Sequence, residues 1–97
     1  MQIISLYNLT KENKKVEGEV FLQGWIKTNR NNGTIGFIEL NDGSCYKNCQ
    51  IVYDKEKIEN FDDITKYLTG CSVHIKGKYV KTPDAKQPFE IHLEELN

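Results

Sequence analysis

Apolar and polar residues alternate along five short stretches of the chain, and this period of two predicts β-strands. The clearest case places Val73 and Ile75 on one face and His74 and Lys76 on the other. In the first stretch both alternating sets contain large apolar residues. We therefore expect either cover on both of its faces or a bulge at Gly24 that exchanges them. The predicted strands span residues 20–27, 35–40, 49–53, 73–79 and 89–94.

Between the third and fourth stretches the period changes to three or four residues, which predicts a helix over residues 54–69. Asn60 could divide this helix into two short pieces, and Gly70 is a natural C-cap. A further short helix or loop is expected around residues 6–15. The order of three strands, a helix and two strands is typical of the OB-fold, a five-stranded Greek-key barrel. The apolar helix positions are Ile58, Phe61, Ile64, Thr65 and Leu68.

The chain has room for one domain. Its 97 residues form a single predicted unit, 1–97, in which residues 1–16 are an N-terminal extension. No apolar run approaches the roughly 20 residues needed to cross a bilayer, and the first residues lack a secretory signal. An odd number of cysteines in this context indicates reduced thiols. We therefore expect a cytoplasmic protein with no membrane partner.

No combination of residues indicates catalysis or metal binding. His74 and His92 lie on polar strand faces without a serine or cysteine at a recognisable nucleophile spacing, which favours solvated side chains. The pair Cys45 and Cys49 lacks the usual zinc spacing, and no second pair follows. A glycine-rich phosphate loop is also missing. The sequence thus predicts no catalytic residue, no metal and no cofactor within these 97 residues.

Phe37 is the residue whose direction matters most. In its strand, Gly36, Ile38 and Leu40 form an entirely apolar set that suits the barrel interior, which leaves Phe37 outside. An outward ring held on an OB strand offers a stacking platform for an unpaired base, worth about 1–3 kcal/mol. Alternatively, the ring packs under a loop or against another domain. The pattern of residues alone leaves both possibilities open.

Arg30, Gln50 and Glu90 are polar residues suited to reading a base beside that ring. Arg30 is the only arginine, and a guanidinium can both stack on a base and donate paired hydrogen bonds. The Gln50 amide matches a donor–acceptor edge, and Glu90 can accept from an exocyclic amine. Ordinary solvation is the alternative explanation for each of them, and the residues alone favour it for Gln50. The net charge of −1 means that any binding depends on placed residues. Possible phosphate contacts are Lys27, Lys47, Lys76 and Lys78.

Several segments, in order, resemble one known family. Together they are similar to the N-terminal anticodon-binding domain of the class II aminoacyl-tRNA synthetases, in the group of aspartyl, asparaginyl and lysyl enzymes. The asparaginyl branch in particular is resembled by residues 42–45, the step from Phe37 to Gln50, and residues 68–73, 77–83 and 87–91. The resemblance covers about residues 17–97. Its segments are residues 24–30, 36–44, 50–52, 68–73, 77–83 and 87–91.

The resemblance implies a role for each candidate residue. Phe37 would stack on the central anticodon base, a uridine for asparagine, with Gln50 hydrogen-bonded to that base and Arg30 in the same pocket. Glu90 would contact the first anticodon base. The implied partners are tRNA and a catalytic domain of the same polypeptide, absent from residues 1–97. That domain would use ATP and magnesium to join asparagine to tRNA(Asn), and the full-length enzyme would be a homodimer.

Other functions remain open on the sequence alone. One is a free-standing OB module that binds single-stranded nucleic acid without base preference. Another is an OB-type interaction or sugar-binding domain, which the near-neutral charge allows. Within the family, an aspartyl- or lysyl-tRNA synthetase is the competing assignment, because their tRNAs share the central uridine.

Overall fold

The computed structural model describes residues 1–16 and 18–97, which form two helices and five strands. No helix among these residues is long and apolar enough to cross a membrane. Each predicted strand is present and extends somewhat beyond its alternating residues. The elements are α1 (Ile3–Lys11), β1 (Glu19–Asn31), β2 (Ile35–Asn41), β3 (Cys49–Asp54), α2 (Phe61–Ile64), β4 (Ser72–Lys81) and β5 (Phe89–Leu96).

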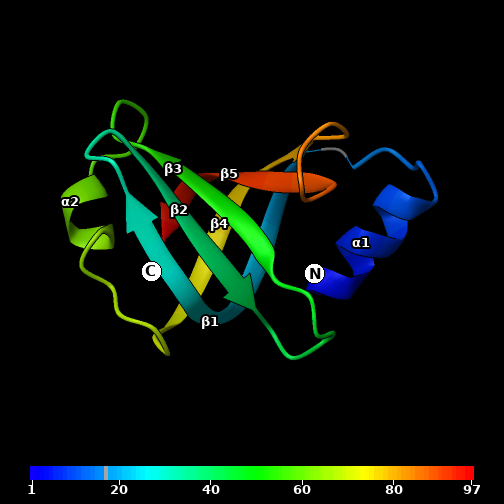
Figure 1. The fold of residues 1–97 in the computed structure, drawn as a ribbon, viewed down its shortest axis with the longest axis horizontal. Helices are drawn as coiled ribbons and strands as arrows, with labels where there is room; N and C mark the ends of the chain where they lie inside the picture. The colour runs from blue at the N-terminus through cyan, green and yellow to red at the C-terminus, as the bar shows by residue number, and fades with distance from the viewer. Residues whose placement is uncertain (17) are drawn as a thin grey trace.

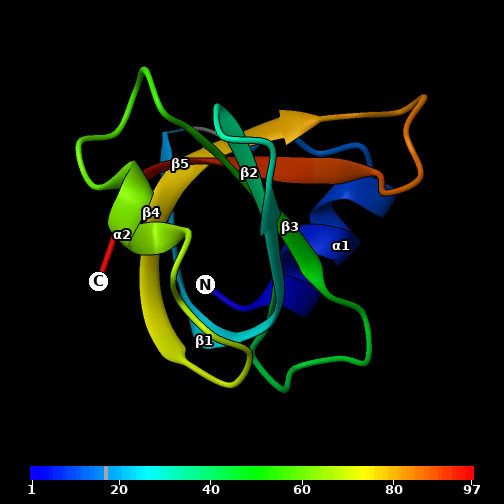
Figure 2. The ribbon, with the colours of Figure 1, turned by 60° about the vertical axis from the view of Figure 1, so that its left-hand side comes forward.

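The strands close into a barrel in the order β1-β2-β3-β5-β4, and Figure 2 shows them curving around a ring. Neighbouring strands are antiparallel except β3 and β5, which run parallel with Ile51 opposite Ile91. α2 lies between β3 and β4 in the chain. This is the architecture of the OB-fold, so the predicted fold class is confirmed.

Every second residue along the strands points into the barrel, and apolar side chains at these positions fill its interior. Ile26, Ile38, Ile51 and Ile91 come from four different strands and have no exposed surface. Burying one such side chain contributes about 1.5–3 kcal/mol. Because Ile38 faces inward, Phe37 on the alternate set of β2 faces outward, as the sequence predicts.

β1 carries two aromatic residues on its outer side. Phe21 is 60% exposed and Trp25 is 39% exposed, so the expectation that both faces of this strand are covered is wrong. Gly24 does not exchange the faces either, because the alternation continues through it. The exchange occurs later, at a bulge where the pairing with β2 shifts between Ile26 and Thr28.

The helix between β3 and β4 is much shorter than predicted. α2 covers only Phe61–Ile64, whose two apolar ends reach the core, whereas Leu68 is 74% exposed. Asn60 precedes the helix as expected, but its side chain makes no capping hydrogen bond. Gly70 has a left-handed φ of +94° well beyond the helix end, so it is not the C-cap of α2. Its N–H donates to the carbonyl of Ile26 (2.7 Å) and returns the chain to the barrel.

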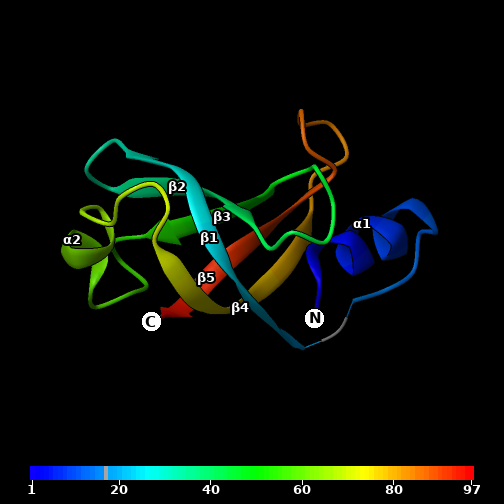
Figure 3. The same ribbon diagram turned by 90° about the horizontal axis from the view of Figure 1, so that it is seen from below.

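α1 packs at one end of the barrel and α2 at the other (Figures 1 and 3). Ile3 and Leu6 of α1 are fully buried in the same core as the strands. The loop after β2 caps the helix: the N–H of Ile3 donates to Asp42 Oδ2 (2.8 Å) and the N–H of Ile4 to Ser44 Oγ (3.0 Å). The segment predicted as an N-terminal extension therefore contributes to the core of the domain.

Replacing Asp42 with asparagine is expected to lower stability at neutral pH and to lose this effect in acid. Burial alone would raise the pKa of Asp42, but hydrogen bonds from Ser44 and from the N–H of Ile3 outweigh it and hold that pKa below the usual 3.8. The carboxylate therefore stabilises the fold above about pH 4, and this contribution disappears as pH falls through the folded-state pKa.

Urea unfolding of wild type and Asp42→Asn at about pH 7 and about pH 3 tests this prediction. The difference in free energy of unfolding between the two proteins should shrink at the lower pH. Asp84→Asn, in an exposed loop, is the matched control and should change stability little. An equal difference between wild type and Asp42→Asn at both pH values would contradict the proposed role of the carboxylate.

Candidate nucleic-acid interface

Two neighbouring rows of outward side chains cross the barrel over β2 and β3. In the first row Arg30 of β1 lies opposite Phe37 of β2. Phe37 in turn lies opposite Val52 of β3, and Val52 lies opposite His92 of β5. Lys78 of β4, opposite His92, ends the row. Directly opposed residues on neighbouring strands have Cβ atoms about 4.5–5.5 Å apart, so this row is continuous.

The second row lies one step along the same strands. Glu39 of β2 is opposite both Thr28 of β1 and Gln50 of β3. Gln50 and Glu90 hold equivalent positions on the parallel strands β3 and β5. The structure therefore brings all the predicted base-contact residues onto one face of the barrel, in two adjacent rows: Arg30, Phe37, Gln50 and Glu90.

The Arg30 guanidinium lies over the ring of Phe37, with its central carbon 5.6 Å from the ring centre. This is a cation–π contact. Phe37 is half-buried between its neighbours, and Arg30 is exposed. A base that stacks on this face of the ring would take the place of the guanidinium. The exposed Arg30 side chain could then donate hydrogen bonds to the edge of the base.

Residues beneath this face fix the direction of both side chains. The ring of Tyr53 on β3 occupies the space where a side chain at Gly36 would lie. Its hydroxyl donates to Asn29 Oδ1 (2.6 Å), and the Asn29 amide donates to backbone carbonyls of α2 and the following turn, 2.8 and 3.1 Å away. Because Asn29 points inward, its neighbour Arg30 points outward. The sequence analysis missed this role of Asn29.

Glu90 has a partner that the sequence analysis treated as a solvated histidine. His92 Nε2 lies 2.6 Å from Glu90 Oε2, and the two side chains are 43% and 18% exposed, respectively. Residues two apart in a strand share a face. The spacing of these two residues was therefore the signal available in the sequence.

The four lysines predicted to contact phosphate do not form one patch. Lys78 lies at the end of the first row, and Lys27 is exposed beside the bulge of β1. The ammonium of Lys47 lies 5.1 Å from the ring centre of an α1 tyrosine. Lys76 forms an ion pair with Glu19 (2.9 Å).

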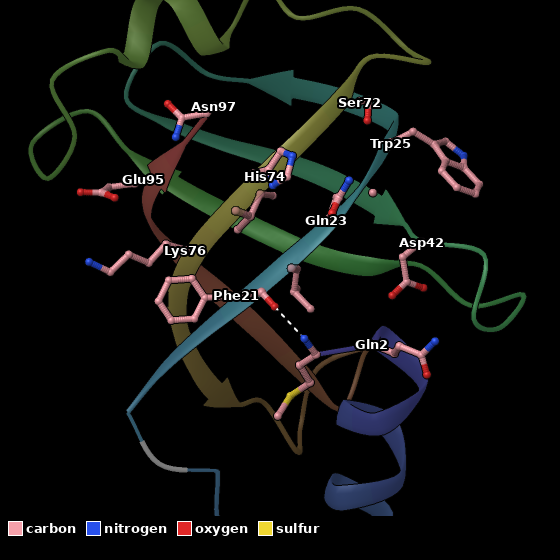
Figure 4. A pocket seen from close by; sticks show the side chains of 14 residues that line it. Gln2, Phe21, Gln23, Trp25, Asp42, Ser72, His74, Lys76, Glu95 and Asn97 are labelled. Carbon is pink, nitrogen blue, oxygen red and sulfur yellow. Dashed lines mark hydrogen bonds between the residues drawn. The ribbon is translucent and has the colours of Figure 1, made fainter.

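A second outer face, formed by β1 and β4, is drawn in Figure 4. Phe21 lies opposite Lys76 and Trp25 opposite Ser72, and the Met1 amino group donates to the carbonyl of Phe21 (3.1 Å). This face contains a hollow. The four predicted base-contact residues all belong to the described part of the chain, and none of them lines the hollow. The face thus displays an exposed phenylalanine apart from the candidate interface.

Residues 1–16 and 18–97 contain no group of three or more histidine, cysteine, aspartate or glutamate side chains placed to hold a metal ion. The cysteines are free thiols. Burial, together with the charges of Asp42 and Cys45, raises the pKa of Cys49 to about 12. The Cys49 thiol is therefore neutral at physiological pH and a poor nucleophile or metal ligand.

The closed five-stranded barrel, with an aromatic ring, a guanidinium and two polar side chains on one open face, defines a nucleic-acid-binding OB domain. Comparison with known families agrees: the tRNA anti-codon family, described as an OB-fold nucleic acid binding domain, matches residues 20–97. The chain belongs to this family.

Two relatives of this chain are asparagine–tRNA ligases. The asparagine–tRNA ligase of Clostridium acetobutylicum is 46% identical over 93 residues, which cover 94% of this chain and 19% of that protein. The asparagine–tRNA ligase of Bacillus cytotoxicus is 48% identical over 92 residues, 95% of this chain and 19% of that protein. The chain therefore spans about a fifth of the length of these relatives.

The structural comparison gives the same relationship. The asparaginyl-tRNA synthetase of Pyrococcus horikoshii, solved with asparaginyl-adenylate, superimposes with a TM-score of 0.73 at 28% identity. The superposition covers 81% of this chain and 18% of that chain. The resemblance to the anticodon-binding domain of the asparaginyl branch is confirmed.

Proposed function

We propose that this chain reads the anticodon of tRNA(Asn) as the N-terminal domain of an asparagine–tRNA ligase. The observation that carries the proposal is the outward ring of Phe37 with Arg30 over it and Gln50 and Glu90 in the adjacent row. Sequence-specific RNA recognition favours unpaired loops, whose bases can be splayed onto a protein surface. An anticodon loop is such a substrate.

Each residue has a distinct task in this proposal. Phe37 stacks on the central uridine of the anticodon. Uracil accepts at O4 and donates at N3, which suits the Gln50 amide as donor and acceptor and the Arg30 guanidinium as donor. Glu90 accepts from the first anticodon base.

Phosphate contacts position the RNA without reading its sequence. The lysines proposed for this task are Lys27, Lys47, Lys76 and Lys78. Because the chain has a net charge of −1, we expect affinity to fall less steeply with salt than for a strongly basic domain.

The activity of the whole enzyme is part of the same proposal. The ligase would join asparagine to tRNA(Asn) with ATP and magnesium, which we assign to a catalytic domain of the same polypeptide. The relatives are about five times as long as the matched region, which supports this assignment. We further propose that the full-length enzyme is a cytoplasmic homodimer.

A titration with RNA hairpins tests the proposal. The domain should bind a hairpin with the asparagine anticodon 5′-GUU more tightly than one with 5′-GCU. Cytosine presents an amine where uracil presents O4, and Arg30 can only donate. The amide of Gln50 can rotate, but the guanidinium cannot adapt. A mismatched polar group of this kind costs about 1–3 kcal/mol, so we expect a preference of about 5- to 150-fold.

The other outcomes identify the competing functions. Equal affinity for both hairpins and for unstructured polyuridine would indicate a single-stranded nucleic-acid module without base preference. No binding at low salt would favour an interaction or sugar-binding domain. Hairpins with the aspartate anticodon 5′-GUC and the lysine anticodon 5′-UUU test the related synthetases, because both keep the central uridine.

A further inference from the structure

The carboxylate of Glu90 is held by one side chain. His92, two residues further along β5 on the same face, places Nε2 2.6 Å from Glu90 Oε2. Within residues 1–16 and 18–97, His92 is the only partner of this carboxylate. The Glu90 side chain is 18% exposed, so only a small part of it is open to a ligand.

The surroundings leave this contact undisturbed. Val52 flanks His92 on β3, and Val80 lies opposite Glu90 on β4. The charged groups nearby are Lys78, opposite His92, and Glu39, one strand beyond Gln50. The end torsion of a glutamate side chain is otherwise broad. A fixed hydrogen-bond donor therefore decides how the Glu90 carboxylate is turned.

We propose that His92 is a positioning residue for reading the first anticodon base. Its Nε2–H donates to one lone pair of Glu90 Oε2 and fixes the carboxylate so that Oε1 and the other lone pair of Oε2 face the RNA. The two oxygens then accept from a base with adjacent N–H donors. This inference rests on the proposed function and deepens it by naming what orients Glu90. The sequence analysis gave His92 no part in binding.

The chemistry of the bases makes guanine the preferred partner. Guanine presents N1–H and the N2 amine side by side, and a carboxylate can accept from both. Adenine presents its N6 amine beside an unprotonated N1, whose lone pair repels a fixed carboxylate oxygen. A well-placed bidentate contact of this type discriminates between bases by about 5- to 150-fold. The asparagine anticodon begins with guanosine.

The test compares two substitutions at His92 that differ in reach. The amide nitrogen of glutamine extends about as far as imidazole Nε2, whereas that of asparagine extends only about as far as Nδ1. The measured quantity is the ratio of Kd values for hairpins with anticodons 5′-AUU and 5′-GUU. We expect His92→Gln to keep most of the wild-type ratio. His92→Asn should reduce the ratio to nearly that of Glu90→Gln.

A double variant makes the test independent of overall affinity. If His92 acts through Glu90, His92→Asn should not change the ratio further once Glu90→Gln is present. Thermal unfolding of each variant checks the fold, and His92, at 43% side-chain exposure, is open enough for substitution. The preference for 5′-GUU over 5′-GCU should stay at its wild-type value in the His92 variants.

The possible outcomes separate the two proposals. If the wild-type domain does not prefer the 5′-GUU hairpin over the 5′-GCU hairpin, the proposed function itself is wrong. A retained central-base preference with an unchanged AUU-to-GUU ratio in His92→Asn would overturn the positioning role alone. Equal weakening of both hairpins by His92→Gln and His92→Asn would also overturn it, because His92 would then contact the RNA directly.

Discussion

Phe37→Ala is expected to weaken binding of the 5′-GUU hairpin by about 1–3 kcal/mol, which is about 5- to 150-fold in Kd. The ring lies on the outer side of β2, and its removal takes away the surface on which the central base stacks. It also removes the support of Arg30, whose guanidinium lies 5.6 Å from the ring centre. Phe37→Trp should retain most of the affinity, because an indole also stacks on a base.

The barrel supplies a matched control for this substitution. Phe21→Ala removes the same ring from an outward position of β1, on the face that holds none of the predicted base-contact residues (Figure 4). We expect Phe21→Ala to change hairpin affinity much less than Phe37→Ala, because the only proposed RNA contact opposite Phe21 is the phosphate contact of Lys76. Calorimetric titration and thermal unfolding of both variants make the comparison. Unchanged affinity in a folded Phe37→Ala would exclude the ring from recognition, and unfolding of that variant would show that the ring is needed for the fold.

Gly36→Ala is expected to cause a large loss of stability. A Cβ atom at this position would lie 1.9 Å from the ring of Tyr53. That ring cannot move aside easily, because it is fully buried, packs against Phe61 at 5.2 Å and donates to Asn29. Overpacking of this kind costs about 1–3 kcal/mol and occasionally more.

Urea unfolding measures the effect of Gly36→Ala on the free energy of unfolding. Gly33→Asn is a suitable control, because nothing lies within 4 Å of that position and asparagine tolerates its positive φ of 92°. In a Tyr53→Val background the penalty of Gly36→Ala should shrink, since the obstructing ring is gone. If Gly36→Ala is as stable as wild type, then the ring of Tyr53 is mobile and does not brace the interface.

The alternation of residues was sufficient to predict the strands and the outward direction of Phe37. Most inward positions of a small barrel are apolar, so an uninterrupted apolar set such as the one containing Ile38 identifies the core face. The opposite set is then displayed by geometry. The same reasoning placed Gln50 and Glu90 outside, which the structure confirms.

Other features could not be read from local patterns. The apolar spacing over residues 54–69 is helical, but only Phe61–Ile64 forms the helix, because periodicity does not report how much of the core remains to be covered. The docking of α1 depends on Asp42 and Ser44, which lie far along the chain. The contact between Glu90 and His92 depends on rotamers, which the sequence pattern does not determine.

The contact between Arg30 and Phe37 could not be predicted without knowing the register between β1 and β2. A count of alternating positions from Val20 would place Arg30 inside the barrel. The bulge between Ile26 and Thr28 reverses that direction. It is hidden in the sequence because several consecutive residues there are polar, so no apolar residue marks the change of face.

The bulge in β1 changes which residues of the strand face outward. Before it the odd-numbered side chains, such as Phe21, face outward, and after it the even-numbered ones, such as Arg30, do. If every residue of this segment were kept but paired without the bulge, Arg30 would turn into the barrel and Asn29 out of it, with no change in composition. The turn at residues 32–34 has no such constraint. Among homologous sequences, insertions and deletions should therefore be tolerated in the turn. Between Ile26 and Arg30, we expect loss of the one extra residue to be tolerated, because it keeps Arg30 outward, and insertion of a second one to be selected against.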